Sequence, residues 1–428
     1  MRGCPNSTLL GGRGVSGQHS LGASLTRDEA FGKLSGVTDD APLEPFKNDN
    51  LLFDVAERYG TPTYLYDLDV VSQQVETLRA ALPDARLLYA VKANPNGAVL
   101  RHLAALGLGA EVITLGELER SLRAGVPPDE VLLGGPGQDE ELVSRALERG
   151  VKLVSLDSVS QWQSWSELDT GGVNFLPRVN PALDPQTHEH LATGAATSKF
   201  GMTVAEATDV ATELTERNQL GGFHVHAGSQ IGSVDVYDEI FAVLRPLYEQ
   251  FGARDLDIGG GFAVPGFELA AFAEKVTAFA LEFGLELTIE PGRYLVAPAG
   301  VLLSKVLHVK YGARGHVIAD AGMADLLRPA LYGAKHPVRV LGKAEQTMTV
   351  DVDGPLCENA DRLARDVTLP RAEPGDLLVI GEAGAYGFTM ASNYASSLRP
   401  AEVVVQGGKP RLVRHRETVD DLLRSECD

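Results

Sequence analysis

Short apolar runs and longer amphipathic stretches alternate along the chain from residue 87 to residue 291. A short apolar run bounded by Gly, Pro or Asn predicts a buried strand, whereas apolar residues at every third or fourth position predict an amphipathic helix. Helical stretches such as AVLRHLAALG and GELERSLRAG end at Gly, a frequent helix C-terminus. The predicted strands cover residues 87–92, 109–114, 130–135, 152–157, 174–179, 222–228, 255–260 and 286–291.

This alternation predicts the fold class. Eight strands separated by helices, over about 200 residues, match the requirement of a (β/α)8 barrel. An open, doubly wound sheet is the structural alternative, but no GxGxxG motif follows the first strand. We therefore expect an α/β protein with a barrel over residues 69–300.

The pattern changes after Ala297. Segments such as VLLSKVLHVKY, QTMTVDVDG, GDLLVIG and AEVVVQGG are β-rich and separated by turns, which predicts a second, mainly β domain over residues 301–428. The helix predicted from LLFDVAERYG and the strand predicted from TPTYLYD precede the barrel, and residues 47–68 are assigned to the same β domain. Residues 1–46 are rich in Gly, Ser and Thr and lack any period, so a disordered leader is expected there.

Composition and charge narrow the function classes. The formal net charge is −20, from 58 acidic and 38 basic residues, and such a surface repels nucleic-acid phosphates. No apolar run approaches the length of a membrane span and no signal-peptide pattern is found, so a cytoplasmic protein without a membrane partner is expected. The three cysteines, Cys4, Cys357 and Cys427, are spaced for neither a disulfide framework nor a zinc site, and we expect no metal.

The first candidate for chemistry is Lys92, at the end of the first predicted strand in YAVKANPN. An isolated lysine is usually a solvated surface residue. In a barrel, however, the C-terminal end of a strand faces the active site, where a lysine can form a Schiff base with an aldehyde cofactor.

Three further motifs follow the last predicted strands. In HVHAGSQ the two histidines share one strand face, which could suggest a metal pair, but no carboxylate or Cys is near in sequence. The His226 ring could instead stack on a flat cofactor. The triplet Gly259–Gly261 is either a flexible turn or a phosphate cradle, and barrels often bind phosphate at this position.

Glu290 and Arg293, in EPGRY, follow the eighth predicted strand. They could form an ordinary surface ion pair, or the carboxylate could keep a pyridine nitrogen protonated. A lysine, a ring that can stack, a phosphate loop and a carboxylate on one barrel rim together indicate a site for pyridoxal 5′-phosphate (PLP).

As an ordered set, the motifs YAVKAN, RVNP with TSKFGM, HVHAGSQ, DIGGGF, EPGR, GPLCENAD and GEAGAYGF resemble those of the fold-type III PLP decarboxylases. This family includes the diaminopimelate, ornithine and biosynthetic arginine decarboxylases. The resemblance covers about residues 51–406. It implies the alanine racemase-like architecture, in which a PLP-binding (β/α)8 barrel is joined to a β domain.

The resemblance also implies a role for each matched position. Lys92 would hold the cofactor aldehyde, and Cys357 of a partner subunit would return a proton to the substrate carbon, in a homodimer with shared active sites. The remaining cofactor contacts would be His226, Ser229, Gly260, Gly261, Glu290, Arg293 and Tyr386.

Within the family, the segments DAGMADLLRPALYGAKHP and SNYASSLRPAEVVV are most similar to diaminopimelate decarboxylases. The substrate contacts implied by that similarity are Arg293, Arg328, Tyr332, Glu358 and Tyr386. The expected reaction is decarboxylation of meso-2,6-diaminopimelate to L-lysine and CO2, a step of lysine biosynthesis. Alternatives are a decarboxylase for another amino acid, a siderophore intermediate or a carrier-linked glutamyl group, a PLP-dependent racemase, or a PLP-binding protein without activity.

Overall fold

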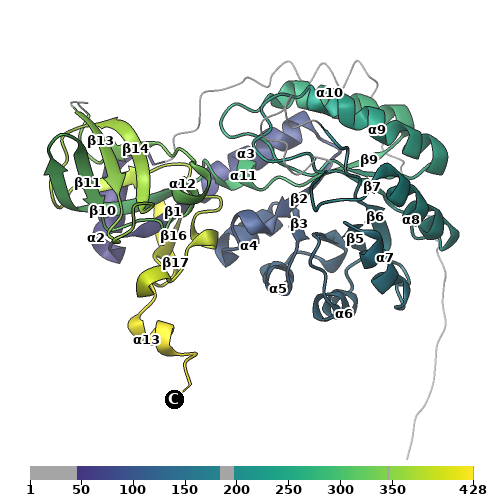
Figure 1. Cartoon of the computed structure of the whole chain (residues 1–428), viewed down its shortest axis with the longest axis horizontal. Coiled ribbons are helices and arrows are strands. Elements are labelled where there is room, and N and C mark those ends of the chain that lie inside the picture. Colours follow the sequence, from purple (N-terminus) through teal and green to yellow (C-terminus); the bar gives the residue numbers. More distant parts are fainter. Residues whose placement is uncertain (1–45, 184–196, 345–347, 428) are drawn as a thin grey trace, which may run out of the picture.

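The computed structural model describes residues 46–183, 197–344 and 348–427 and shows a barrel beside a β domain (Figure 1). The predicted leader lies outside the described residues except for Phe46. That residue is buried, and its carbonyl oxygen accepts a hydrogen bond from Arg339.

Eight parallel strands form the barrel sheet, in the order β6-β5-β4-β3-β2-β9-β8-β7. Isolated bridges, Phe175 with Leu220 and Arg178 with His224, join the two ends of this order and nearly close the barrel. The predicted barrel is therefore confirmed. Its strands are β2 (Arg86–Ala90), β3 (Gly109–Val112), β4 (Val131–Leu133), β5 (Leu153–Leu156), β6 (Asn174–Pro177), β7 (Gly222–His224), β8 (Asp255–Asp257) and β9 (Glu286–Ile289).

Helices cover the outside of this sheet (Figure 1). Each buries an apolar stripe, and α5 and α6 end at Gly125 and Gly150, which adopt the left-handed conformation that a side chain disfavours. The helices are α3 (Leu68–Ala81), α4 (Gly97–Ala105), α5 (Leu115–Ala124), α6 (Glu140–Arg149), α7 (Val159–Ser166), α8 (Val204–Glu216), α9 (Val236–Phe251), α10 (Leu269–Phe283) and α11 (Arg293–Val296), with 3-10 turns η1 (Val91–Ala93) and η2 (Pro128–Glu130).

The β domain is built on a second sheet, with the order β14-β13-β11-β10-β1-β16-β17 and with β15 linking β10 to β12. The early strand β1 lies between β10 and β16, so the chain enters the β domain before it builds the barrel. The strands are β1 (Thr63–Asp67), β10 (Gly300–Tyr311), β11 (Gly315–Ala319), β12 (Val338–Val340), β13 (Met348–Asp353), β14 (Arg362–Leu369), β15 (Leu377–Ile380), β16 (Ala401–Gln406) and β17 (Lys409–Arg414). Also present are α2 (Asp49–Tyr59), α12 (Arg328–Tyr332), α13 (Val419–Leu423), η3 (Phe388–Met390) and η4 (Tyr394–Ser396).

The two units meet at the rim of the barrel. The backbone N–H of Tyr386 donates to the carbonyl of Ala93 at 2.8 Å, and the Asn94 side chain donates to the carbonyl of Gly384 at 2.9 Å. A loop of the β domain therefore lies against the turn that follows the first barrel strand. The domain boundaries inferred from the sequence stay a prediction. Among the described residues, no helix combines the length and the apolar character that crossing a membrane requires.

The strands end earlier than the sequence pattern predicts. β2 stops at Ala90, and Lys92 lies in the 3-10 turn η1, where Asn94 N–H donates to the carbonyl of Val91. Similarly, β7 stops at His224, two residues before His226. Apolar periodicity marks burial, and burial here continues past the last strand residue into the rim.

Candidate active site

Lys92 forms an ion pair with Glu111 at the C-terminal end of the barrel. Its Nζ lies 2.7 Å from Oε2 of Glu111, a residue near the end of the neighbouring strand β3. Glu111 is buried, whereas the Lys92 side chain keeps 36% of its surface exposed. A buried carboxylate thus fixes the position of a lysine that stays accessible from solvent.

The charge of Lys92 is set by opposing effects. Burial lowers the pKa of its ammonium, but the negative charges of Glu111 and Glu290, together with Tyr386, raise that pKa above the ordinary value. Without a cofactor the group is therefore an ammonium, held in an ion pair with Glu111.

A second group of side chains lies inside the barrel, behind the lysine. Ligand atoms of His224, Asp257 and Glu290 lie within 4.8 Å of one another, and all three residues are buried. His224 Nδ1 bonds the hydroxyl of Ser155 at 2.6 Å, while its Nε2 lies 3.8 Å from Glu290. The sequence shows no carboxylate near the two histidines, but strands β8 and β9 bring two of them there.

Burial is the main reason that the pKa of Glu290 is raised well above its usual range, and the nearby charges of Asp257 and Glu111 act in the same direction. Within the described part of the chain, Glu290 Oε1 and His224 Nε2 have no hydrogen-bond partner. A cationic N–H donor placed at Glu290 would satisfy its carboxylate, and a protonated pyridine nitrogen is such a donor.

The glycine loop after β8 is closely packed against both neighbouring loops. A Cβ on Gly260 would lie 2.2 Å from the carbonyl oxygen of Glu290, and one on Gly261 would lie 2.0 Å from that of Gly228. Gly261 also has a φ of +91°, which side chains rarely tolerate. The backbone N–H of Gly260 donates to His226 Nδ1 at 3.1 Å, so the other ring nitrogen carries the hydrogen.

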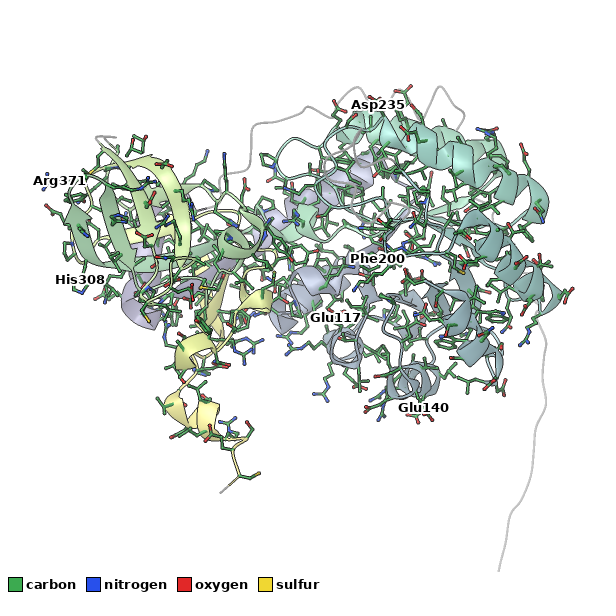
Figure 2. The ribbon with its side chains drawn as sticks, viewed as in Figure 1. Glu117, Glu140, Phe200, Asp235, His308 and Arg371 are labelled. Atoms are coloured by element: carbon green, nitrogen blue, oxygen red, sulfur yellow. The ribbon has the colours of Figure 1, made fainter. Side chains whose placement is uncertain are left out.

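Burial, followed by the positive charges of Arg178 and Lys92, lowers the pKa of His226 well below the ordinary value. A neutral, oriented ring is suited to stacking on a flat cofactor. Arg178 in turn lies over the ring of Phe200 at 5.0 Å, and Phe200 is labelled at the barrel in Figure 2.

Arg293 begins helix α11 and joins the barrel to the β domain. Its guanidinium donates to the Ser229 hydroxyl at 3.2 Å and lies 4.9 Å from the ring centre of Tyr386. Its Nη1 is buried without a hydrogen-bond partner among the described residues. The structure thus brings together one free donor, a hydroxyl and a glycine loop, which is a suitable set for a phosphate group.

Arg328, the first residue of α12, provides a second cation near Arg293. Burial and the repulsion from Arg293 lower the pKa of Arg328 to about 10, while Tyr386, Glu382 and Tyr332 oppose this shift. Two guanidinium groups close enough to repel one another favour an anion between them. Tyr332 is 67% exposed, so this end of the site opens to the surface.

Cys357 and Glu358 lie elsewhere in the β domain. Both side chains are exposed, and the contact of Glu358 is with the hydroxyl of Tyr394 at 3.1 Å. In the described part of the chain, neither residue shares a hydrogen bond or an ion pair with Lys92. Their exposure leaves both side chains accessible to a partner subunit.

Sequence reasoning missed several residues of this site. Glu111 had a signal, because a charged residue in the otherwise apolar run GAEVIT requires a partner. Asp257 and Glu382 lie inside the motifs DIGGGF and GEAGAYGF, which were used to identify the family without giving these two residues a role. The sequence does not indicate which side chains lie next to them. His224 was weighed only as a metal ligand.

The residues fit three functional groups of PLP: the aldehyde, the ring nitrogen and the phosphate. Lys92 matches the aldehyde, the unsatisfied Glu290 oxygen matches the ring nitrogen, and the Arg293 donor with the glycine loop matches the phosphate. The fold and the site thus define a class: barrel enzymes that work with PLP.

Comparisons with known proteins agree with this class. Residues 68–297 match the family model described as the pyridoxal-binding domain of pyridoxal-dependent decarboxylases. The chain belongs to the pyridoxal-dependent decarboxylase family, so it is a carboxy-lyase with PLP as its cofactor.

Among the relatives is the diaminopimelate decarboxylase of Deinococcus radiodurans, 42% identical over 88% of this chain and 98% of its own. The Helicobacter pylori diaminopimelate decarboxylase complexed with L-lysine has a TM-score of 0.81 at 32% identity, covering 87% of this chain and 98% of that one. The diaminopimelate decarboxylase from M. jannaschii in co-complex with L-lysine has a TM-score of 0.83 at 30% identity, covering 88% of this chain and 94% of that one.

Proposed function

We propose that this protein decarboxylates meso-2,6-diaminopimelate to L-lysine and CO2. The observation that carries the proposal is the pair of neighbouring guanidinium groups, Arg293 and Arg328, beside the surface tyrosine Tyr332. Arg293 faces the phosphate side, which leaves Arg328 for a second anion. Diaminopimelate has a carboxylate far from the one that is lost, whereas ornithine and arginine do not. The relatives named diaminopimelate decarboxylase support the same choice.

When bound, PLP supplies an electron sink for the electron pair left on the substrate carbon as CO2 departs. Glu290 would hold the ring nitrogen protonated, and His226 would lie against the ring. Glu111, 2.7 Å from Lys92 Nζ, would hold that amine in position. The phosphate would be held by Ser229, Gly260, Gly261, Arg293 and Tyr386.

The reaction consumes one proton, because the departing carboxylate is replaced by hydrogen. We propose that Cys357 of the partner subunit gives this proton and that Glu358 of the partner subunit binds the distal ammonium. The support is twofold. Both side chains are exposed in one copy, and the large side chains Leu331, Tyr332 and Tyr394 are exposed as well. Exposed apolar side chains of this size favour a covered surface, here a homodimer interface.

Replacing Cys357 with Ala is expected to lower kcat by about 100-fold, the usual contribution of a positioned proton donor. The matched control is Cys427→Ala, which removes the other exposed cysteine of the described residues and should leave kcat unchanged. Mixing Cys357→Ala protein with Lys92→Ala protein tests the sharing of sites. If subunits exchange freely, half the dimers are mixed and each has one intact site, so activity should recover to about one quarter. No recovery after proven exchange would place Cys357 and Lys92 of one chain in the same site.

The substrate is tested by CO2 release from the PLP-loaded protein with meso-diaminopimelate, ornithine, arginine and lysine. We expect kcat/KM for diaminopimelate to exceed the others by about 1,000-fold or more, because a substrate without the distal carboxylate leaves buried donors unpaired. L-lysine should be the product. No CO2 from any of the four would favour an acylated, carrier-linked or siderophore substrate, and inversion of an amino acid without CO2 would identify a racemase.

A further inference from the structure

His336 is a buried histidine that the reaction as described above does not use. It lies just before strand β12, 4% exposed, and faces the end of strand β15. These two strands are paired, with Val338 opposite Ile380, and Gly381 N–H donates to the Pro337 carbonyl at 2.8 Å. The backbone next to His336 is therefore held against strand β15.

Both ring nitrogens of His336 are hydrogen bonded, and their partners determine the tautomer. Nδ1 lies 2.9 Å from the carbonyl oxygen of Gly381, which can only accept, so Nδ1 carries the hydrogen. Nε2 lies 3.2 Å from Nη1 of Arg328, which can only donate, so Nε2 is the acceptor. Only the neutral Nδ1–H form satisfies both bonds.

The surroundings keep the ring neutral. Burial lowers the pKa of His336 to about 4, and the Gly381 carbonyl only partly offsets the burial and the positive charges of Arg328 and Arg293. These two guanidinium groups are the charged groups that face the ring. A protonated ring would lose its bond to Arg328 and add a third positive charge to the pair.

We propose that His336 is a positioning residue that directs the Arg328 guanidinium toward the substrate carboxylate that is not lost, and thereby sets the selectivity for substrates with that carboxylate. The inference rests on the proposed function for the identity of the anion. The Arg328 side chain makes no other hydrogen bond or ion pair among the described residues, so within that part of the chain only the His336 ring bonds its guanidinium, at Nη1.

The substitutions His336→Asn and His336→Gln test the bond to Gly381 and the bond to Arg328 separately. Asn at position 336 can reach Gly381 as Nδ1 does but has no acceptor near Arg328, whereas Gln can place its carbonyl oxygen near the position of Nε2. The ligands are L-lysine, which has the carboxylate, and cadaverine, which is the same diamine without it. Inhibition constants and calorimetric binding are measured for both ligands on the PLP-loaded protein.

For His336→Asn we expect L-lysine to bind about 10- to 100-fold more weakly, because an orienting bond to a charged group is lost. The KM for diaminopimelate should rise by a similar factor, with kcat within about threefold and with cadaverine affinity unchanged. His336→Gln should stay within about fivefold of the parent protein for lysine. Thermal denaturation of both variants checks the fold.

Equal losses for lysine and cadaverine, equal losses in the Asn and Gln variants, or a fall in kcat alone would each overturn the inference. An unmodified protein that releases no CO2 from diaminopimelate would instead overturn the proposed function. In that case lysine and cadaverine binding still tests whether His336 orients Arg328, because binding needs no turnover.

Discussion

Replacing Lys92 with Ala is expected to lower kcat by about 10,000-fold or more, because this amine is the group that binds the cofactor aldehyde. The phosphate contacts do not depend on Lys92, so PLP should still bind but should be removable by gel filtration or dialysis. The measurements are CO2 release, the visible absorbance of the protein, and cofactor retention after dialysis.

The matched control is Lys92→Arg. Arginine keeps a positive charge beside Glu111 but cannot form the bond to the aldehyde, so it separates the loss of the bond from the loss of the ion pair. Lys92→Ala leaves the buried Glu111 carboxylate without its partner and should be the less stable of the two variants. Both should lose activity. Turnover of Lys92→Ala within tenfold of the parent protein would contradict the assignment.

Replacing Glu290 with Gln is expected to lower kcat by about 100- to 1,000-fold. Gln has the same size and can accept a hydrogen bond, but it cannot hold a positive charge on the ring nitrogen, which weakens the cofactor as an electron sink. The fold should tolerate the change, because burial already raises the pKa of Glu290 so that a neutral side chain is favoured in the free protein. The measurements are kcat for CO2 release and the thermal midpoint of unfolding.

Glu286→Gln is the control for this experiment. Glu286 begins the same strand, β9, at the opposite end of the barrel, and it is an exposed residue paired with Arg254. An exposed pair contributes little, so neither kcat nor stability should change measurably. If the two glutamine variants lost activity equally, a general effect on strand β9 would replace a role at the cofactor nitrogen.

The barrel was predictable because apolar periodicity and the length of the runs are properties of the local sequence. Each predicted strand exists, and the helices end at glycines such as Gly125. The ends of the strands were less predictable. Lys92 follows its strand in a 3-10 turn because the backbone turns there, although the side chains on both sides remain buried.

The candidate site was predictable where one residue has a distinctive chemistry at a strand end. Lys92, the glycine loop and Glu290 meet because the C-terminal ends of parallel strands share one rim. Glu111 and His336 were not identified, because an isolated acidic residue or histidine has the same local signal in a packed core as in a site.

By itself, the sequence determined the order of strands and helices, the chemical groups on the barrel rim and the family that they resemble. Burial patterns and motif spacing depend on residues that are close in sequence, so they can be recognised without knowing any distant contact. Only the tertiary structure decided which polar groups interact: Lys92 with Glu111, Glu290 with Asp257, and Arg328 with His336. These partners come from different strands or from facing loops, and the pKa and orientation of each group depend on the low-dielectric surroundings that the folded chain creates.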